Sequence, residues 1–441
     1  MTINTKIDKI QTVSFHTLGC KLNQAETNSL RTRFEEYGYT IVPFRNPADL
    51  TIINTCTVTN SADSKSRQAI RTAVKSSPNC RVIVVGCYSQ VSPEELKSIK
   101  GIDLILGTHE KYQIFDYLNK IESSKLENPL VYVNDSGEIT AYKESPFISS
   151  TGRTRAFLKV QEGCDYFCTY CIIPFARGRA RSRKLYDCIE EAQKLVDLGF
   201  KEIILTGINI GTWNAESLKL CDLLDKLSQI SGLHRIRISS IEPNTITDNL
   251  LQLVKERDNI CNHLHIPLQS GSNTVLERMG RKYFISDFIS LQDRIQKIVP
   301  NISCGTDIIT GFPGETEEEF QETVDFISNS QFSYLHIFRY SERDGTVASK
   351  LKNKIDQQLK KERSVILHQI GNNKKKQYVE KFINTAQTVL FETSKDGFSS
   401  GMTSNYIRVR VTSSKNLNNK IYQVKLLDNT ESFVIGEIIS K

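Results

Sequence analysis

The sequence predicts a multidomain α/β protein with three parts. These are an N-terminal parallel-sheet α/β domain, a central partial (β/α)6 barrel and a small C-terminal antiparallel β-barrel. Short apolar runs alternate with helical stretches in both of the first two parts, and after about residue 382 the hydrophobic period changes to two. We therefore expect domains at 11–145, 150–372 and 374–440.

In the first part, three apolar runs predict buried strands and one segment predicts a helix. The strands are "TVSFHTL" (12–18), "LTIINT" (50–55) and "RVIVVG" (81–86), and the helix is 23–38. Strands that alternate with helices form a parallel sheet. The stretch 134–152 contains Gly, Ser and Pro and predicts a linker.

In the second part, six apolar runs separated by helical segments predict an open or partial β/α barrel. The runs are "AFLKVQ", "EIILTGIN", "RIRISSIEP", "HLHIPLQ", "CGTDIITGF" and "FSYLHIFRY". A charged stretch with helical apolar spacing follows at 355–382. Its expected inner face consists of Ile355, Leu359, Ile366, Ile370 and Phe382.

In the third part, "NYIRVRVT" and "IYQVKLL" place apolar residues at alternate positions. Short alternating strands need closure or pairing to hide their edges, which favours a small barrel. The expected inward residues are Ile407, Val409, Val411, Val424 and Leu426.

Composition limits the cellular setting and the partners. The chain has 441 residues and eleven cysteines, and its first residues lack the hydrophobic core of a signal peptide. We therefore expect a cytoplasmic protein whose cysteines serve metal or redox chemistry, with no membrane partner. Five of the seven excess positive charges lie within 374–441. That excess indicates contact with a polyanion, and a basic but merely soluble tail fits the same charge.

The stretch "EGCDYFCTYCIIPFARGRARSRK" (162–184) holds Cys164, Cys168 and Cys171 directly after the first predicted barrel strand. Structural zinc and ordinary iron–sulfur carriers use four protein ligands, so a zinc site here needs a distant fourth residue. Three thiolates on a four-iron cluster instead leave one iron open for a substrate. The mouth of a β/α barrel is where such folds keep their sites.

Cys20, Cys56 and Cys87 each follow a predicted strand by one or two residues. Because parallel strands bring their carboxyl ends to one sheet edge, we expect the three thiols to converge there. Each of them taken singly is equally compatible with a small buried hydrophobe. Convergence would make a second cluster with an open iron.

The loop cysteines, with Tyr170 before the last one, resemble the signature of the radical S-adenosylmethionine (SAM) superfamily. Further segments make the whole chain similar to the methylthiotransferases of that superfamily. These segments are "TLGCKLNQAET" (17–27), "INTCTVTNSAD" (53–63), "VVGCYSQ" (84–90) and "GMTSNYIRVRV" (401–411). The resemblance implies a methylthiotransferase domain, a radical-SAM core and a C-terminal TRAM domain that binds RNA.

This resemblance implies two [4Fe-4S] clusters and SAM as cofactors. Cys164, Cys168 and Cys171 fall on the SAM-cluster ligands, and Cys20, Cys56 and Cys87 fall on the auxiliary-cluster ligands. One SAM yields a 5′-deoxyadenosyl radical and another donates a methyl group. "GCKLNQAE", "IIPFARGRARSR" and "TSNYIRV" are closest to the branch that adds methylthio to C2 of N6-threonylcarbamoyladenosine at position 37 of tRNA.

The implied partners are a tRNA anticodon stem-loop and an electron donor such as a flavodoxin or ferredoxin, without DNA. Two alternatives keep the chemistry and change the substrate to isopentenyladenosine in tRNA or to an aspartate of a ribosomal protein. A third, of another class, is a noncatalytic RNA-binding protein stabilised by zinc.

Four segments at later strand ends offer groups for SAM. They supply Gly207 in "LTGIN", Glu242 in "SSIEP", Gln269 in "PLQSGS" and Gly311 in "TGFPGET". Turn-forming glycines and a structural ion pair of Glu242 explain the same residues equally well.

Basic residues predict the RNA contacts. Arg177, Arg179 and Arg181 follow the cysteine loop, where phosphates of an anticodon stem could be held, and a solvated basic run is an equal alternative. In the last part, Arg408 and Arg410 lie close in sequence to tyrosines suited to stacking on unpaired bases, or to core packing. Those tyrosines are Tyr406 and Tyr422.

Overall fold

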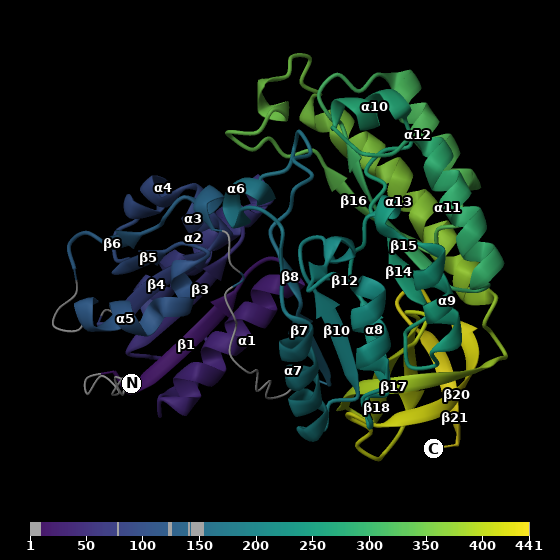
Figure 1. Cartoon of the computed structure of the whole chain (residues 1–441), viewed down its shortest axis with the longest axis horizontal. Helices are drawn as coiled ribbons and strands as arrows, with labels where there is room; N and C mark the ends of the chain where they lie inside the picture. The colour runs from purple at the N-terminus through teal and green to yellow at the C-terminus, as the bar shows by residue number, and fades with distance from the viewer. Residues whose placement is uncertain (1–9, 77–78, 122–125, 140–141, 143–153, 441) are drawn as a thin grey trace.

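The computed structural model describes residues 10–76, 79–121, 126–139, 142 and 154–440. Figure 1 shows the N-terminal α/β domain beside a larger β/α barrel, with helix α1 (Lys21–Glu36) between them. The C-terminal strands form a small barrel at the opposite end of the β/α barrel from α6 (Ile173–Arg177) and α10 (Asn273–Arg278). The three predicted architectures are therefore confirmed.

The N-terminal domain is a six-stranded sheet in the order β2-β1-β3-β4-β5-β6, with every neighbouring pair parallel. Its strands are β1 (Thr12–Thr17), β2 (Thr40–Val42), β3 (Leu50–Thr55), β4 (Arg81–Gly86), β5 (Leu104–Leu106) and β6 (Leu130–Tyr132). Its other helices are α2 (Asn60–Ser76), α3 (Cys87–Val91), α4 (Pro93–Lys97) and α5 (Ile114–Leu118).

Every residue of β3 is buried, as expected for a central parallel strand covered on both faces. Leu50 and Ile52 pack in one core with α1 and α5, and Ile53 packs in the other core with α2. The predicted strands at 12–18, 50–55 and 81–86 are thus confirmed, and the helix predicted at 23–38 lies two residues earlier as α1.

The central part has two parallel sheets, β13-β10-β7 and β14-β15-β16, whose adjoining edges are joined by bridges from Ile236 to Ile260 and from Ser240 to His265. Together they form the partial barrel of six strands. The strands are β7 (Arg155–Lys159), β10 (Glu202–Thr206), β13 (Arg235–Ile238), β14 (His263–His265), β15 (Ser303–Thr310) and β16 (Tyr334–Arg339). The remaining helices are α7 (Leu185–Asp197), α8 (Leu220–Ser228), α9 (Asp248–Glu256), α11 (Ile285–Ile298) and α12 (Glu317–Asn329).

The first barrel strand ends earlier than predicted. The run "AFLKVQ" divides into β7 and the short strand β8 (Gln161–Glu162), which pairs antiparallel with β9 (Arg181–Ser182). This pair closes the base of the loop that carries Cys164, Cys168 and Cys171. A short antiparallel hairpin, β11 (Asn214–Ala215) with β12 (Leu218–Lys219), follows β10.

The helix predicted at 355–382 is α13 (Gln357–Glu380), and its predicted inner face is confirmed only at Ile370 and Phe382, which pack against the barrel core and the C-terminal core. Ile366 is exposed, and the buried face instead consists of Lys360, Arg363, Leu367, Gly371, Lys374 and Tyr378, with Val379 beside it. Long basic side chains can bury their stems when their ends find acceptors. The Lys374 ammonium donates to two backbone carbonyls, and Arg363 pairs with Glu315.

The C-terminal part is a closed barrel in the order β17-β18-β19-β21-β20. Its strands are β17 (Ala386–Lys395), β18 (Phe398–Thr403), β19 (Arg408–Thr412), β20 (Ile421–Asn429) and β21 (Val434–Ser440). The predicted inward residues are all buried, which confirms the alternation: Ile407, Val409, Val411, Val424 and Leu426.

Most of the predicted linker at 134–152 lies outside the described residues, as do the proposed boundaries at 145 and 150. Its described start forms a 3-10 helix, Ser136–Glu138, and the Ser136 hydroxyl donates to the Phe175 carbonyl. Among the helices of the described ranges, none combines the length and apolar character that crossing a bilayer requires.

Candidate active site

The three sheet-edge cysteines, Cys20, Cys56 and Cys87, follow the neighbouring strands β1, β3 and β4 at their carboxyl ends, as predicted. Close approach at this edge depends on Gly19, which has φ +98°. A Cβ atom there would lie 2.9 Å from the Cys56 sulfur. Only glycine accepts this conformation and this contact without strain.

The sheet-edge thiols lie close enough to affect one another's pKa. Burial, followed by the charges of Cys87 and Cys20, raises the pKa of Cys56 to about 12. Burial also raises the pKa of Cys87, while Arg177 opposes that shift. Three adjoining thiolates are therefore costly unless a cation neutralises them. The arrangement suits a positively charged metal group.

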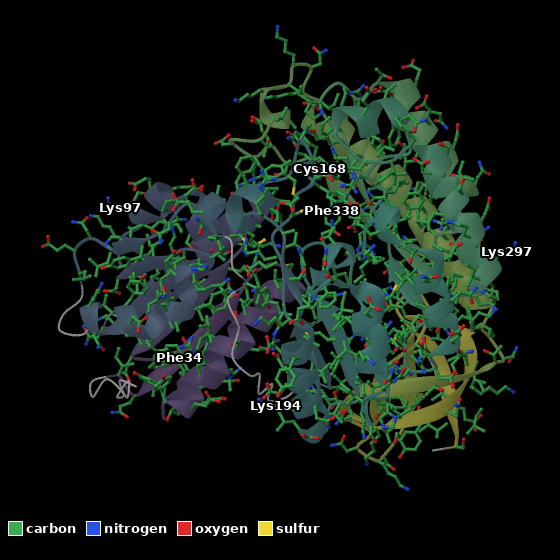
Figure 2. The ribbon with its side chains drawn as sticks, in the orientation of Figure 1. Phe34, Lys97, Cys168, Lys194, Lys297 and Phe338 are labelled. Atoms are coloured by element: carbon green, nitrogen blue, oxygen red, sulfur yellow. The ribbon has the colours of Figure 1, made fainter. Side chains whose placement is uncertain are left out.

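The loop cysteines, Cys164, Cys168 and Cys171, lie in the loop whose two ends are joined by the pairing of β8 with β9. The Cys164 amide donates to the Gly178 carbonyl, and the Cys171 amide donates to the Cys168 carbonyl. Thr169 anchors the loop to the end of α10, because its hydroxyl donates to the Arg278 carbonyl. Figure 2 shows Cys168 on the side of the barrel that faces the N-terminal domain.

The loop thiols also raise one another's pKa. Burial and the charges of Cys168 and Cys164 raise the pKa of Cys171 to about 12, and burial is the largest cause that raises the pKa of Cys164 to about 11. Arg281 provides a compensating charge, since its Nη1 donates to the Cys168 sulfur over 3.0 Å.

Glu242, predicted to contact SAM, forms an ion pair with Arg281. Burial raises the pKa of the Glu242 carboxyl, and Arg281 opposes this shift. Arg281 therefore links the Glu242 carboxylate to the Cys168 sulfur. The structure brings this predicted residue to the cysteine loop and also confirms the alternative of an ion pair.

Arg177 does not lie where the RNA prediction placed it, and that prediction is wrong for this residue. Its side chain is fully buried and forms ion pairs of 2.8 Å with Glu26 of α1 and with Glu162. Its Nε donates to the Cys87 sulfur over 3.3 Å. A guanidinium with these partners cannot reach a phosphate. It connects the cysteine loop to the sheet-edge cysteines instead.

A buried charge network surrounds this connection. Lys111 and Lys159 form ion pairs with Glu26 of 2.6 and 3.3 Å, and Lys159 also pairs with Glu162. The two carboxylates face three cations including Arg177, so the pKa of Glu26 is held well below its usual range. Buried charges persist only when paired in this way.

Arg181 is likewise buried, and its guanidinium donates to the carbonyls of Arg179 and Arg177, so its predicted phosphate contact is also wrong. Arg179 is different. Its side chain is 63% exposed, lies 3.6 Å from Asp165 and stacks on the Phe167 ring at 4.5 Å. Of these three arginines, it remains available to RNA.

A cavity of about 350 Å³ lies between the segment that follows Cys56 and the loop that carries Cys171. Val58 and Thr59, just after Cys56, line one side, and Tyr170 and Cys171 line another. Barrel residues complete its wall: Gln269, Asp307, Ile309 and Phe338. We call this space the central cavity. Arg343 holds the loop after Cys56 against the barrel through an ion pair with Asp63 and a hydrogen bond to Thr57.

The other predicted SAM groups divide into two sets. Gln269 lines the central cavity beside Cys171, and Gly207 packs against Gln161, whose amide oxygen accepts from the amides of Ile208 and Asn209. Both therefore lie by the cysteine loop. Gly311 does not line this cavity.

The surroundings of Gly311 explain its glycine. Its amide donates to Glu315, its φ is +70°, and a Cβ there would overlap Lys360. The structure supports the alternative of a turn-forming glycine at this position.

In the C-terminal barrel, Arg408 and Arg410 are exposed on β19. Arg410 lies 3.8 Å over the Phe433 ring. Tyr406 instead stacks on His263 at 4.4 Å at the end of the β/α barrel, and Tyr422 packs beside the C-terminal core. The predicted base stacking by these two tyrosines is therefore not supported, and the alternative of packing is.

Geometry also separates a cluster site from zinc. Thiolates around one zinc ion lie about 3.8 Å apart, given Zn–S bonds of about 2.3 Å in a tetrahedron. Within the described ranges, the group of metal-binding side chains whose ligand atoms all lie within 4.8 Å is His265, Asp307 and His336, without any cysteine. Neither group of cysteines meets this criterion, and each offers three thiols, which fits a cluster that leaves one iron without a protein ligand.

Several residues of the site were not predicted. Arg281 and Arg343 come from charged segments with no distinguishing pattern, and Glu26 lies on a helix face that looks solvated in the sequence. Asn209 is buried, and neither the nitrogen nor the oxygen of its side-chain amide has a hydrogen-bond partner within the described chain. It lies in the predicted "LTGIN" segment, so that segment was the available signal.

Two family models match the chain. Residues 12–107 match the model described as uncharacterized protein family UPF0004, and residues 158–327 match the radical SAM superfamily. The first match covers all three sheet-edge cysteines, and the second covers all three loop cysteines.

Full-length relatives are more specific. The chain is 42% identical over 436 residues to the threonylcarbamoyladenosine tRNA methylthiotransferase MtaB of Bacillus subtilis, covering 97% of this chain and 96% of the relative. It is 38% identical to the MtaB of Thermotoga maritima, covering 87% of each. It is 34% identical to the tRNA-2-methylthio-N(6)-dimethylallyladenosine synthase of Alkaliphilus oremlandii, covering 96% and 92%.

A solved structure supports the fold. The radical S-adenosylmethionine methyltransferase TsrM from Kitasatospora setae, solved with cobalamin and a [4Fe-4S] cluster, superposes with a TM-score of 0.54 at 14% identity, covering 77% of each chain. The cysteine geometry, the two family models and the full-length relatives agree. The chain belongs to the radical-SAM methylthiotransferase family.

Proposed function

We propose that this protein adds a methylthio group to C2 of N6-threonylcarbamoyladenosine at position 37 of tRNA. The observation that carries the proposal is a cavity lined by Cys171 on one side and by the residues after Cys56 on the other, in a chain 42% identical to a relative of that name. The dimethylallyladenosine relative is less similar, at 34%. Two [4Fe-4S] clusters and SAM are the cofactors of this chemistry.

We assign the loop cysteines to the cluster that binds SAM and the sheet-edge cysteines to the auxiliary cluster. When bound, these groups supply an electron that cleaves SAM to a 5′-deoxyadenosyl radical, and they hold the sulfur that the base receives. Two clusters that serve one base must open on one space, and the central cavity is lined from both sides.

The residues of this chain place charge and exclude water around that space. Arg177 donates to the Cys87 sulfur and Arg281 donates to the Cys168 sulfur, so each cysteine group has a buried cation beside it. Such cations stabilise thiolates over thiols. Arg343 keeps the loop after Cys56 on the barrel and so preserves the facing arrangement.

For SAM, we retain Glu242, Gln269 and the backbone at Gly207, and we add Asn209, whose buried amide lacks a partner in the described chain. A buried polar group without a partner is costly, so a ligand that satisfies it gains affinity. Gly311 is left out, because Glu315 and Lys360 occupy its surroundings.

For tRNA, we propose that Arg179, near the cysteine loop, and Arg408 and Arg410, on the C-terminal barrel, hold an anticodon stem-loop. The C-terminal barrel belongs to the proposed domain 374–440. All three are exposed arginines, which suits phosphate contacts. The domains 11–145 and 150–372 would hold the auxiliary cluster and SAM. We propose a cytoplasmic setting with a flavodoxin or ferredoxin as electron donor.

Mass spectrometry of tRNA nucleosides from cells with and without the gene tests this function. Deletion should remove 2-methylthio-N6-threonylcarbamoyladenosine and raise its unthiolated precursor, and the wild-type gene should restore it. A gene with Cys168→Ala should not. Loss of a different methylthio nucleoside would move the substrate to another branch of the family.

A further inference from the structure

The concave face of the β/α barrel is polar. Strand alternation sends Ile203, Leu264 and Ile308 outward into the main core, so their neighbours point inward. Inward positions include Glu202, Arg237, His265, Asp307 and His336. We call the space that these side chains surround the barrel interior. Asp307 also lines the central cavity, so the two spaces adjoin.

Helix α1 covers part of this concave face. Ala25 of α1 packs in a cluster with Phe157 of β7 and Ile204 of β10, both at inward positions. The helix begins at Lys21, directly after Cys20. The first turn of α1 therefore lies between the sheet-edge cysteines and the barrel interior.

Lys21 lies one helical turn before Ala25, so both residues are on the face of α1 that faces the barrel interior. The charged groups that lie near enough to act on its ammonium are Arg237, Arg155, Glu202 and Asp307. The side chain is accessible to solvent, although these groups surround it. A side chain that is both crowded and accessible projects into an internal space.

The neighbouring cations already have anionic partners, whereas Lys21 does not. Arg155 pairs with Glu392 at 2.9 Å, and Arg237 pairs with Glu202 at 2.7 Å. Lys21 has no ion pair or hydrogen bond of its side chain within the described chain. The barrel interior thus has an excess positive charge that an anion would neutralise.

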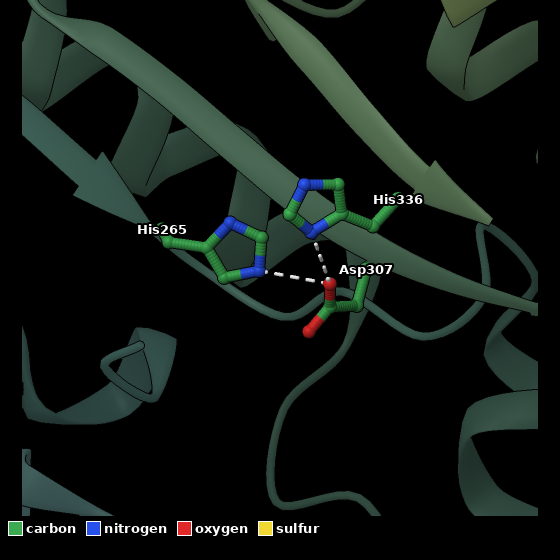
Figure 3. A group of neighbouring side chains, drawn as sticks. All are labelled: His265, Asp307 and His336. Carbon is green, nitrogen blue, oxygen red and sulfur yellow. Dashed lines mark ion pairs between the residues drawn. The ribbon is translucent and has the colours of Figure 1, made fainter. Parts of the chain in front are cut away.

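The remaining carboxylate of this region is engaged elsewhere. The imidazole rings of His265 and His336 point at the same oxygen of Asp307, and their nearest nitrogens lie 2.9 and 3.3 Å from it (Figure 3). The two histidines hold the pKa of Asp307 well below its usual range. The side chain of His336 is 52% exposed and lies at an inward position of β16.

We propose that Lys21 is the specificity-determining residue that binds the carboxylate of the threonylcarbamoyl group. The proposal rests on the proposed function, because that substituent carries one carboxylate whereas an isopentenyl substituent carries none. An ammonium and a carboxylate that meet in a partly desolvated space attract more strongly than on the surface. A neutral substituent would bury Lys21 without a partner and would be disfavoured.

The test uses reconstituted holoenzyme and three anticodon stem-loops, which carry N6-threonylcarbamoyladenosine, its methyl ester or isopentenyladenosine. The proteins are wild type, Lys21→Met, Lys21→Arg and the control Lys97→Met, an exposed lysine on α4. The readouts are kcat/KM for each RNA, iron content and the Kd of each RNA for cluster-free protein.

Wild type should prefer the acid over the ester by roughly 10- to 100-fold, as for a hydrogen bond to a charged group. Lys21→Met should lose this preference both in kcat/KM and in Kd. Lys21→Arg and Lys97→Met should keep most of it.

Equal use of acid and ester by wild type would overturn the inference alone, as would a preference that survives in Lys21→Met. If Lys21→Met fails to hold iron, the wild-type comparison and the cluster-free Kd values decide. Activity of wild type on an isopentenyladenosine stem-loop and on neither of the others would instead refute the proposed function, and this inference with it.

Discussion

At the scale of single residues, Arg177 connects the cysteine loop with the sheet-edge cysteines. It comes from the cysteine loop, pairs with Glu26 of the N-terminal domain 151 positions away, and touches the Cys87 sulfur. Removal of its guanidinium would leave buried carboxylates uncompensated. This would lower the free energy of unfolding by about 3–5 kcal/mol.

Arg177→Met should therefore lower the thermal midpoint of the cluster-free protein strongly and reduce the iron bound after reconstitution. The matched control is Arg179→Met, because Arg179 is exposed and two positions away, where an ion pair contributes about 0–1 kcal/mol. Calorimetry of both variants checks this. Similar losses in the two proteins would contradict the account of Arg177.

The cysteines make a second prediction at this scale. Cys168→Ala should abolish formation of 5′-deoxyadenosine, whereas Cys56→Ala should retain some of it and lose sulfur insertion, because the two thiols belong to different groups. Chromatography of the SAM products measures both. Cys304→Ala is the control, since Cys304 is buried in the barrel core. SAM cleavage by Cys168→Ala at the wild-type rate would refute the assignment.

Residues also show what a sequence can predict. Cys20, Cys56 and Cys87 were predictable together because parallel strands end at one edge, whatever their separation in the chain. Arg177 and Arg181 were not, because a run of alternating basic residues has the pattern of a solvated segment. Their burial depends on Glu26 and Glu162, and no local pattern connects an arginine to a carboxylate on a distant helix.

At the scale of elements, α13 and the C-terminal barrel show the same division. The alternation of Val409 and Val411 predicted a half-buried strand, because period two follows from strand geometry alone. The face of α13 was predicted only in part, because Lys374 and Arg363 bury their stems where other elements supply acceptors. Apolar periodicity does not record such acceptors.

The C-terminal barrel gives an element-scale prediction at Gly401 of β18. A Cβ there would overlap the carbonyl oxygen of Leu390 on β17, and backbone cannot move aside as a side chain can. Gly401→Ala should destabilise this barrel by roughly 1–3 kcal/mol, in the range of overpacked cores.

Hydrogen exchange of the full chain measures the effect of Gly401→Ala, since protection in β17 and β18 should fall while the N-terminal sheet is unchanged. Ser400→Ala on the same strand is the control. Unchanged protection in Gly401→Ala would show that the strand pair tolerates the added methyl group.

At the scale of the whole molecule, the three parts meet around the β/α barrel. The N-terminal domain covers its concave face through α1, and the C-terminal barrel is held by Arg235 and Arg237, which donate to the carbonyls of Met402, Thr403 and Ser404. This arrangement leaves the central cavity between the segment after Cys56 and the loop with Cys171, and it keeps exposed arginines on the outside.

The most direct test of the central claim is a single reconstituted reaction. The purified holoenzyme, a chemical reductant, a sulfide source and SAM are combined with an anticodon stem-loop that contains N6-threonylcarbamoyladenosine. The account predicts an RNA in which methylthio replaces hydrogen on the base, with 5′-deoxyadenosine and S-adenosylhomocysteine formed in equal amounts. An unmodified RNA alongside a modified isopentenyladenosine stem-loop, or zinc without acid-labile sulfide in active protein, would contradict it.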